Sequence, residues 1–324
     1  MNVFRALAYA TLTAAVTCGP AFAQSAQDFP NREIRVIVPF TPGSGSDTGA
    51  RHFGDQLGRL LGRAVVVENK PGAGGIVALS MVKAMPADGY TIVLASSSPF
   101  SVNPVVMKDL PYDPYNDFKP LAGLAKGMNV LVVKEEPGVD TLRQFVAKAQ
   151  EARQPISVGT YSAGYELATA WLADVGKFKY TNIPYKGQAA IITDVVGGRL
   201  DAAMLNLSAA IELINTGKLK ALAVSGGSRH PSLPNVPTFK ESGFPDYETY
   251  SWTSFYVHSQ TPPDVTKVLS DAMTEIMSRP ESRAFLAREG SLPMPTTPEE
   301  MLAFQKSEQA RFKQVADAAG IVPQ

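Results

Sequence analysis

The sequence has few of the residues from which disulfide scaffolds and metal centres are built. Its 324 residues include one cysteine, Cys18, and three histidines, which lie far apart at His52, His230 and His258. One cysteine excludes a disulfide scaffold and a cysteine-cluster metal site, and the spacing of the histidines leaves no local zinc-binding pair. We therefore expect neither a metal nor another cofactor.

An excess of charge of either sign is also missing. Lysine and arginine together number 30, and so do aspartate and glutamate, which gives a formal net charge of zero. Broad nucleic-acid binding needs a basic face that displaces phosphate counterions, so we expect no nucleic-acid partner. The hydrophobic share of 45% is ordinary for a folded protein, and the length suggests about two domains.

Long apolar runs are absent, and a short one stands at the N-terminus. After Arg5, residues 6–16 are uncharged and mostly apolar, which is shorter than the roughly 18 residues that a membrane span requires. The triplet Ala21-Phe22-Ala23 follows with the small-x-small pattern of a cleavage site. Residues 1–23 are therefore predicted to be a secretory signal peptide, cleaved after Ala23, and the protein is expected to be exported.

Cys18 offers a second interpretation of this segment, a lipoprotein signal in which the cysteine carries the lipid. Such signals have a small residue directly before the cysteine and usually leucine three positions before it. Thr17 and Ala15 stand there instead, so cleavage after Ala23 is favoured. The mature chain would then contain no cysteine.

Short apolar runs alternate with amphipathic stretches along the rest of the chain, which is typical of an α/β fold with mainly parallel strands. The strands are predicted at 34–39, 64–68, 91–95, 130–133, 156–159, 180–183, 202–205 and 221–225. The helices are predicted at 48–61, 75–84, 142–153, 166–175, 263–278, 280–288 and 297–318. The last three helices are expected to follow one another with no strand between them.

Two apolar stretches, residues 121–131 and 250–257, have the character of connections between domains. They predict a discontinuous domain 1, residues 24–125 plus 251–324, and a domain 2, residues 126–250, with a small-ligand cleft between them. One larger sheet with a long insertion is the alternative, and the periodicity does not separate the two.

The first predicted strand runs into a glycine-rich turn, Phe40–Asp47, and then a helix. Free amides and the partial positive charge of a helix N-terminus make such a turn a natural anion site. It is not a dinucleotide fingerprint, because Thr48 stands where the third glycine belongs. A plain turn capped by Ser46 or Asp47 is the other interpretation.

The same strand-turn-helix construction recurs after residues 156–159, 180–183 and 202–205. Because the carboxyl ends of parallel strands point the same way, these loops should meet at one edge of the sheet. They offer hydroxyls, amides, one lysine and tyrosine rings, which suits a small carboxylate with an apolar body. Any single loop could equally be an ordinary turn.

Catalytic motifs are missing. No serine lies in a Gly-x-Ser-x-Gly elbow, the mature chain has no thiol, and no histidine follows a strand of the middle segment. We therefore expect a protein that is not an enzyme. A secreted hydrolase or isomerase is the least favoured alternative.

Several motifs stand in a fixed order from one end of the predicted mature chain to the other. They are Val38-Pro39-Phe40 with Pro42-Gly43, Val67-Glu68-Asn69-Lys70, Ala87-Asp88-Gly89-Tyr90-Thr91, Asn103-Pro104, Pro184-Tyr185-Lys186-Gly187, and 232–238. In this order they resemble the periplasmic solute-binding receptors of tripartite tricarboxylate transporters, the TctC-like or Bug-type proteins.

The resemblance implies a two-domain periplasmic-binding-protein fold, the Venus flytrap, with the ligand in the cleft. It implies a periplasmic receptor that captures a small carboxylate, is expected to be monomeric, and delivers the ligand to membrane permease subunits. A ligand-sensing receptor that feeds a regulatory system is the alternative. The resemblance places ligand contacts at Thr41, Gly43, Ser44, Asp47, Ser162, Gly164, Tyr185, Lys186 and Gly187, and the strand-end loops add Ser97, Tyr161 and Asn206.

The sequence departs from the family pattern at two places in the expected site. Ser44 replaces a second glycine, and the loop 159–166 is shorter than usual. The ligand therefore cannot be taken from relatives. Rings at Tyr161, Tyr165 and Trp252 suggest a carboxylate with an apolar or aromatic body, and dicarboxylates remain open.

Overall fold

The computed structural model describes residues 29–135, 138–294, 297–318 and 320–323. The predicted signal peptide, residues 1–23, and Cys18 within it lie outside the described residues. Within the described ranges, every helix is either too short or too polar to cross a membrane.

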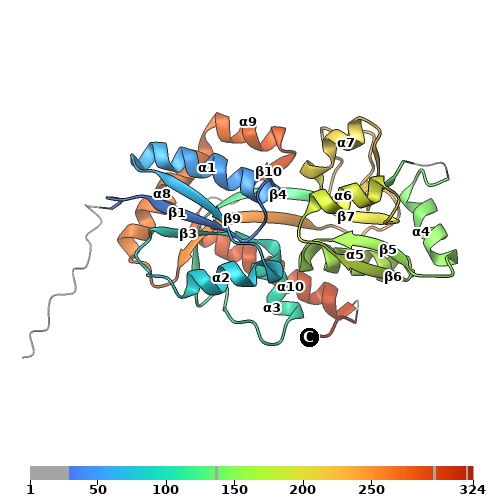
Figure 1. The fold of residues 1–324 in the computed structure, drawn as a ribbon, viewed down its shortest axis with the longest axis horizontal. Coiled ribbons are helices and arrows are strands. Elements are labelled where there is room, and N and C mark those ends of the chain that lie inside the picture. Colours follow the sequence, from blue (N-terminus) through green and yellow to red (C-terminus); the bar gives the residue numbers. More distant parts are fainter. Residues whose placement is uncertain (1–28, 136–137, 295–296, 319, 324) are drawn as a thin grey trace, which may run out of the picture.

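Two sheets follow one another along the long axis of the molecule (Figure 1). They share the long strand β4 (Phe118–Lys134). The first sheet contains, in order, β2 (Val65–Asn69), β1 (Ile34–Val38), β3 (Thr91–Ser96), β9 (Tyr250–His258) and β4, with β10 (Ser291–Pro293) paired to β4. The second contains β4, β7 (Ala202–Asn206), β5 (Ile156–Thr160) and β6 (Tyr180–Pro184), with β8 (Leu219–Val224) on the other side of β4.

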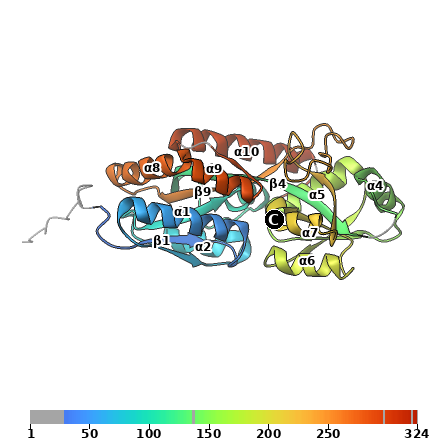
Figure 2. The same cartoon turned by 90° about the horizontal axis from the view of Figure 1, so that it is seen from above.

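Helices cover both faces of each sheet (Figure 2). Those of the first sheet are α1 (Gly45–Leu61), α2 (Ile76–Lys83), α3 (Asn103–Val106), α8 (Pro263–Ser278), α9 (Pro280–Arg288) and α10 (Pro298–Ala318). Those of the second are α4 (Leu142–Glu151), α5 (Ala163–Gly176), α6 (Gln188–Val196) and α7 (Ile211–Asn215). Short helical segments are η2 (Ala73–Gly75), η3 (Ser98–Val102) and η4 (Leu207–Ala209).

The α/β class and the predicted strands and helices are confirmed, but the expectation of mainly parallel strands is wrong. The pairs β1–β2, β1–β3, β5–β6 and β5–β7 are parallel, whereas every pair that involves β4 or β9 is antiparallel. The sequence showed β4 only as residues 130–133, because Pro120, Gly123 and Gly127 interrupt its apolar pattern. Two register shifts in its pairing with β9 accommodate these interruptions.

One prediction about the C-terminal helices is also corrected. The three-residue strand β10 lies between α9 and α10, and it was too short to give a periodic signal. Helix α10 contacts η3 and also helix α5 of the second sheet. Phe312 and Val315 of α10 pack in one apolar cluster with Leu167 of α5.

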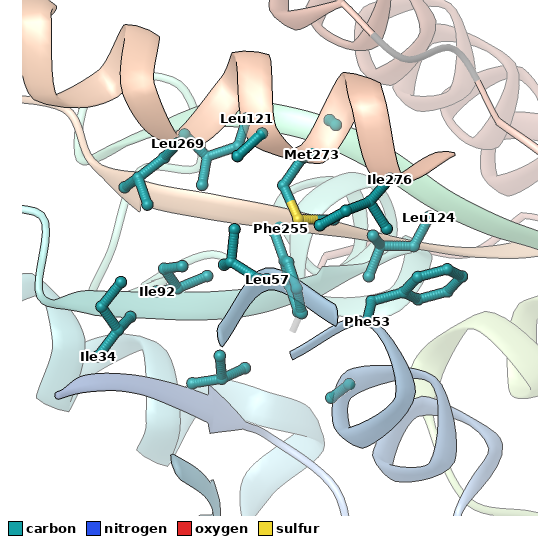
Figure 3. Packing of buried hydrophobic residues seen from close by; sticks show 14 of the residues in the cluster. Ile34, Phe53, Leu57, Ile92, Leu121, Leu124, Phe255, Leu269, Met273 and Ile276 are labelled. Carbon is teal, nitrogen blue, oxygen red and sulfur yellow. The ribbon is translucent and has the colours of Figure 1, made fainter. Parts of the chain in front are cut away.

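The main apolar core lies between the first sheet and the helices α1 and α8 (Figure 3). Phe53 and Leu57 of α1 meet Phe255 of β9, and Leu269 and Met273 of α8 cover the same face. All five side chains are fully buried. This packing fixes α1 against the sheet and therefore fixes the direction of its N-terminus.

A buried carboxylate, Asp47, holds the turn between β1 and α1. Its Oδ2 accepts hydrogen bonds from the Gly43 amide (2.9 Å) and from Nε of Arg51 (3.1 Å), and its Oδ1 accepts from Nδ2 of Asn69 (2.9 Å). The N-cap of α1 is Ser44, whose hydroxyl accepts from the Asp47 amide, and not Ser46 or Asp47. The turn is therefore a rigid, internally satisfied structure.

The close approach of β5 to helix α6 predicts a stability effect at Gly159. A methyl group there would lie 2.7 Å from Cγ2 of Ile191 and 2.8 Å from Cδ1 of Leu200. We expect Gly159→Ala to lower the free energy of unfolding by about 1–3 kcal/mol. The matched control is Gly49→Ala in α1, where a methyl group meets nothing within 4 Å. This control should raise the free energy of unfolding by about 0.5–1 kcal/mol. Urea denaturation measures both, and equal effects would contradict the packing described here.

The Asp47 network predicts a pH-dependent stability. Burial alone would raise the pKa of Asp47, but hydrogen bonds from Arg51, Gly43 and Asn69 outweigh it and lower the pKa below its usual value. The stabilisation is therefore present above the unfolded pKa of about 3.9 and is lost as pH falls through the lower folded value. We expect Asp47→Asn to cost about 1–3 kcal/mol at pH 7.

The measurement is denaturant unfolding of the wild type and of Asp47→Asn between pH 3 and pH 7. The difference between their free energies of unfolding should become smaller as the pH falls. Asp55→Asn in the same helix removes only an exposed ion pair with Arg59 and should change stability by less than about 1 kcal/mol. A constant difference at all pH values would rule out the charged form of Asp47 as its source.

Candidate functional site

A cavity of about 70 Å³ lies between the two sheets, where the carboxyl ends of β1, β3, β5 and β7 come together. At about 10–15 Å³ per water it holds roughly five to seven water-sized groups. The lining hydroxyl and amide side chains are Ser46, Ser96, Ser97, Ser98, Ser162, Gln188, Asn206, Ser208, Ser251, Thr253 and Ser291. The cavity thus suits a small polar molecule.

Three helices of nine or more residues begin at this cavity. Ser46 lies in the first turn of α1, Ser162 is the N-cap of α5, and Gln188 opens α6; all three line the cavity. The first-turn amides of a helix have no partner within it, and its N-terminus carries a partial positive charge. At the starts of α5 and α6, no side chain of the N-cap residue accepts a hydrogen bond from these amides either. The cavity is therefore polarised to receive an anion.

No cationic side chain contributes to this polarity. The described residues that line the cavity include no lysine, arginine or histidine, and the single charged residue among them is Glu289. Among the lining residues, the groups that can attract an anion are therefore backbone amides and neutral donors.

Ser98 connects the two sides of the cavity. Its hydroxyl donates to Oγ of Ser162 at 2.9 Å and accepts from the amide of Gly164 at 3.1 Å. Ser98 follows β3 of the first sheet, while Ser162 and Gly164 follow β5 of the second. These hydrogen bonds link the two halves of the molecule across the cavity.

Asn206 organises the far wall rather than pointing a free amide at the cavity. Its Oδ1 accepts from the amide and the hydroxyl of Ser208, and its Nδ2 donates to Oγ of Ser251 at 2.7 Å. Its own amide donates to Oε1 of Gln188, which leaves the NH₂ group of Gln188 available. Gln188 is therefore a donor that lines the cavity from α6.

Aromatic rings form the apolar wall. The rings of Tyr161 and Tyr165 lie 4.5 Å apart, and the hydroxyl of Tyr161 donates to that of Tyr165. Burial raises the pKa of both hydroxyls, so both stay neutral. Phe40 meets Tyr161 edge-on at 6.4 Å.

Two polar atoms of the lining residues have no hydrogen-bond partner in the described part of the chain. They are Nε1 of Trp252 and Oγ of Ser96, both almost fully buried. An unpaired buried donor costs free energy, so two such groups beside one cavity mark it as a place where a partner is missing.

The structure distributes the twelve predicted site residues over three positions. Ser97, Tyr161, Ser162 and Asn206 line the cavity. Thr41, Tyr185 and Lys186 line a neighbouring cavity of about 530 Å³, which shares Phe40, Tyr161 and Ser162 with the first. The remaining five, Gly43, Ser44, Asp47, Gly164 and Gly187, line neither.

These five residues shape the loops. Gly43 is in the left-handed region (φ 78°) and donates its amide to Asp47, while Ser44 caps α1. Gly164 donates its amide to Ser98. A side chain at Gly187 would lie 2.9 Å from Oγ1 of Thr41, so this glycine allows the β1 loop to approach α6.

Several lining residues were missed in the sequence. Ser98 is the last of three consecutive serines at the end of β3, and that run was the available signal. Four further lining residues come from the end of α9, the turn after it and the start of β10: Phe285, Leu286, Glu289 and Ser291. That turn has no motif and follows no parallel strand, so nothing in the sequence pointed to it.

Metal-ligating side chains do not gather anywhere in the described ranges: no three histidine, cysteine, aspartate or glutamate residues lie close enough to hold an ion.

Comparison with known proteins places this geometry in one family. The profile of the tripartite tricarboxylate transporter family receptor (TctC) matches residues 50–321. The chain is 31% identical over 323 residues to the protein BugT of Bordetella pertussis, covering 99% of both chains.

Solved structures agree with the sequence comparison. An R. palustris protein whose structure is described with adipate is 30% identical, with a TM-score of 0.88, and the match covers 92% of this chain and 100% of that one. MatC from Rhodopseudomonas palustris with bound malate is 26% identical, with a TM-score of 0.83, over 89% of this chain and 99% of that one. The periplasmic binding protein BugD is 27% identical, with a TM-score of 0.85, and the match covers 91% of this chain and 100% of that one. The chain belongs to the tripartite tricarboxylate transporter receptor family, whose members are solute-binding receptors with a two-domain periplasmic-binding-protein fold.

Proposed function

We propose that the protein captures a small carboxylate in the cavity between its sheets and delivers it unchanged to the membrane subunits of a tripartite tricarboxylate transporter. The observation that carries this proposal is the meeting of three helix N-termini at a hydroxyl-lined cavity without a cationic side chain. Fixed amides and hydroxyls are suited to carboxylate oxygens. Relatives described with adipate and malate support the choice of ligand class.

Within the cavity, we assign the carboxylate to the N-termini of α1 and α5 and to the hydroxyls of Ser97 and Ser162. Tyr161 and Tyr165 cover the apolar body of the ligand, which can be aliphatic or aromatic. Hydrogen bonds to a charged group contribute about 1.5–3 kcal/mol each, and several of them, partly offset by desolvation, give micromolar or tighter affinity.

Domain closure completes the site. In this proposal residues 24–125 with 251–324 and residues 126–250 move relative to each other, and the hydrogen bonds of Ser98 to Ser162 and Gly164 form when they close. The ligand favours the closed state only by its higher affinity for that state. The membrane partner then distinguishes a loaded receptor from an empty one by its shape.

Export fits the same role. Residues 1–23 act as a signal peptide cleaved after Ala23, and the mature protein works in the periplasm as a monomer that performs no chemistry on its ligand. The family relationship supports the compartment, and the sequence pattern supports the cleavage position.

A thermal-shift screen tests the ligand class. We expect the melting temperature of the purified protein to rise with one class of carboxylates, because a ligand that binds only the folded state at 100 times its Kd adds about 2.7 kcal/mol. The panel should contain aliphatic and aromatic monocarboxylates, dicarboxylates, tricarboxylates and amino acids, with matched amides as controls. Shifts by the amides equal to those by the acids, or conversion of a bound ligand into product, would contradict the proposal.

Replacing Ser98 tests the closed geometry. Ser98→Ala removes two hydrogen bonds between the halves of the molecule, and we expect it to weaken carboxylate binding about tenfold. Ser101→Ala in the same segment removes a buried hydroxyl that has no partner among the described residues and should leave affinity within about twofold. Calorimetry with the strongest ligand of the screen, after circular dichroism has shown both variants folded, measures the effect. Equal affinities in the two variants would exclude the role of Ser98.

A further inference from the structure

We propose that Glu289 is a specificity-determining residue that pairs with a cationic group on the ligand, so that the preferred ligand is an amino-carboxylate rather than a dicarboxylate. This inference rests on the proposed carboxylate function and specifies the substrate class of the same cavity. It is carried by the charge pattern of the lining.

Glu289 is the single charged residue among the described residues that line the cavity, and its side chain is only partly exposed. No hydrogen bond or ion pair to its carboxylate comes from any other described residue, whereas nearby Glu281 has Arg279 as a partner. A carboxylate beside a small cavity is only partly hydrated, and a positive partner would stabilise it.

The backbone adds to the negative potential at this point. Glu289 is the C-cap of α9, and the C-terminus of a helix carries a partial negative charge. Arg288 lies next to it in sequence but is exposed and does not line the cavity. The cavity therefore combines positively polarised helix starts with one negatively charged wall.

The position of Glu289 is fixed by the closed arrangement of the protein. The next residue, Gly290, has φ 61° and lies against the second half of the molecule, where a side chain would be 2.7 Å from Cδ1 of Ile211. Ser291 then pairs with Gly127 of β4. Glu289 is thus held on a short, constrained turn rather than on a free loop.

The chemistry of a matching ligand follows from this arrangement. Its carboxylate would face the helix N-termini, and its ammonium group would meet Glu289. Its apolar body would lie between the tyrosine rings and the side chains of Phe285 and Leu286. A second carboxylate in that place would be repelled by a like charge. Neutral hydroxyls elsewhere in the lining do not discriminate between these ligands.

Calorimetry at pH 7 and low salt with four acids of five carbons tests the inference. Pentanoate carries one carboxylate and glutarate carries two; 2-aminopentanoate and 5-aminopentanoate add an ammonium group near to the carboxylate or far from it. We expect at least one amino acid to bind the wild type ten or more times more tightly than pentanoate and glutarate.

The variant Glu289→Gln should bind that amino acid about ten times more weakly than the wild type does. Its affinity for pentanoate should stay within about twofold of the wild-type value, and it should bind glutarate more tightly than the wild type does. Glu281→Gln, on the same helix and outside the cavity lining, should change none of these values. The unchanged pentanoate affinity also shows that the variant is folded.

Two different failures are distinguishable. If glutarate or pentanoate binds the wild type as tightly as both amino acids, or if Glu289→Gln keeps the preference, the role of Glu289 is overturned while carboxylate binding stands. If none of the four acids binds and the wider carboxylate screen is also flat, the proposed function falls and this inference falls with it.

Discussion

The antiparallel pairing of β4 with β9 is the constraint on which the rest of the structure depends. These strands pair from Phe118 opposite His258 to Met128 opposite Tyr250, and β4 then continues into the second sheet beside β7 and β8. Both sheets are therefore built on one continuous strand, which sets how their edges face each other. At the crossing, a side chain at Gly127 would lie 2.8 Å from Nδ2 of Asn206, so the strand carries no side chain at this close approach of the two halves.

The same constraint brings helix N-termini to the cavity. The parallel strands on either side end at the crossing, and the helices that follow them begin there. A lysine or arginine in such a place would lose hydration and would need a partner of its own, whereas helix amides are held in position by the fold. An anion site made of backbone dipoles therefore needs no buried cation beside the ligand.

The sequence predicts most of the fold because strand and helix periods are local properties. Strands β1, β3, β5 and β7 and helices α1, α5 and α8 are confirmed close to their predicted bounds. The long strand β4 was seen in part, since the proline and glycines that let it bend also hide it. Four residues of the site could be found because each lies at the end of a strand or directly after it: Ser97, Tyr161, Ser162 and Asn206. Phe285 and Glu289 could not, because only the tertiary packing of α9 against α1 brings them to the cavity.

In the proposed binding mode, the groups that give affinity are different from the group that gives selectivity. Amides at the starts of α1, α5 and α6 interact with any carboxylate in much the same way, so they contribute equally to the binding of competing acids and cannot discriminate among them. Discrimination requires a group that attracts one ligand and repels another. In the described lining only Glu289 carries a charge, and it comes from a turn outside the strand-end loops. In the proposed binding mode, selectivity can thus change through the α9–β10 turn, while the loops that would bind the carboxylate are tied to the architecture of the sheets.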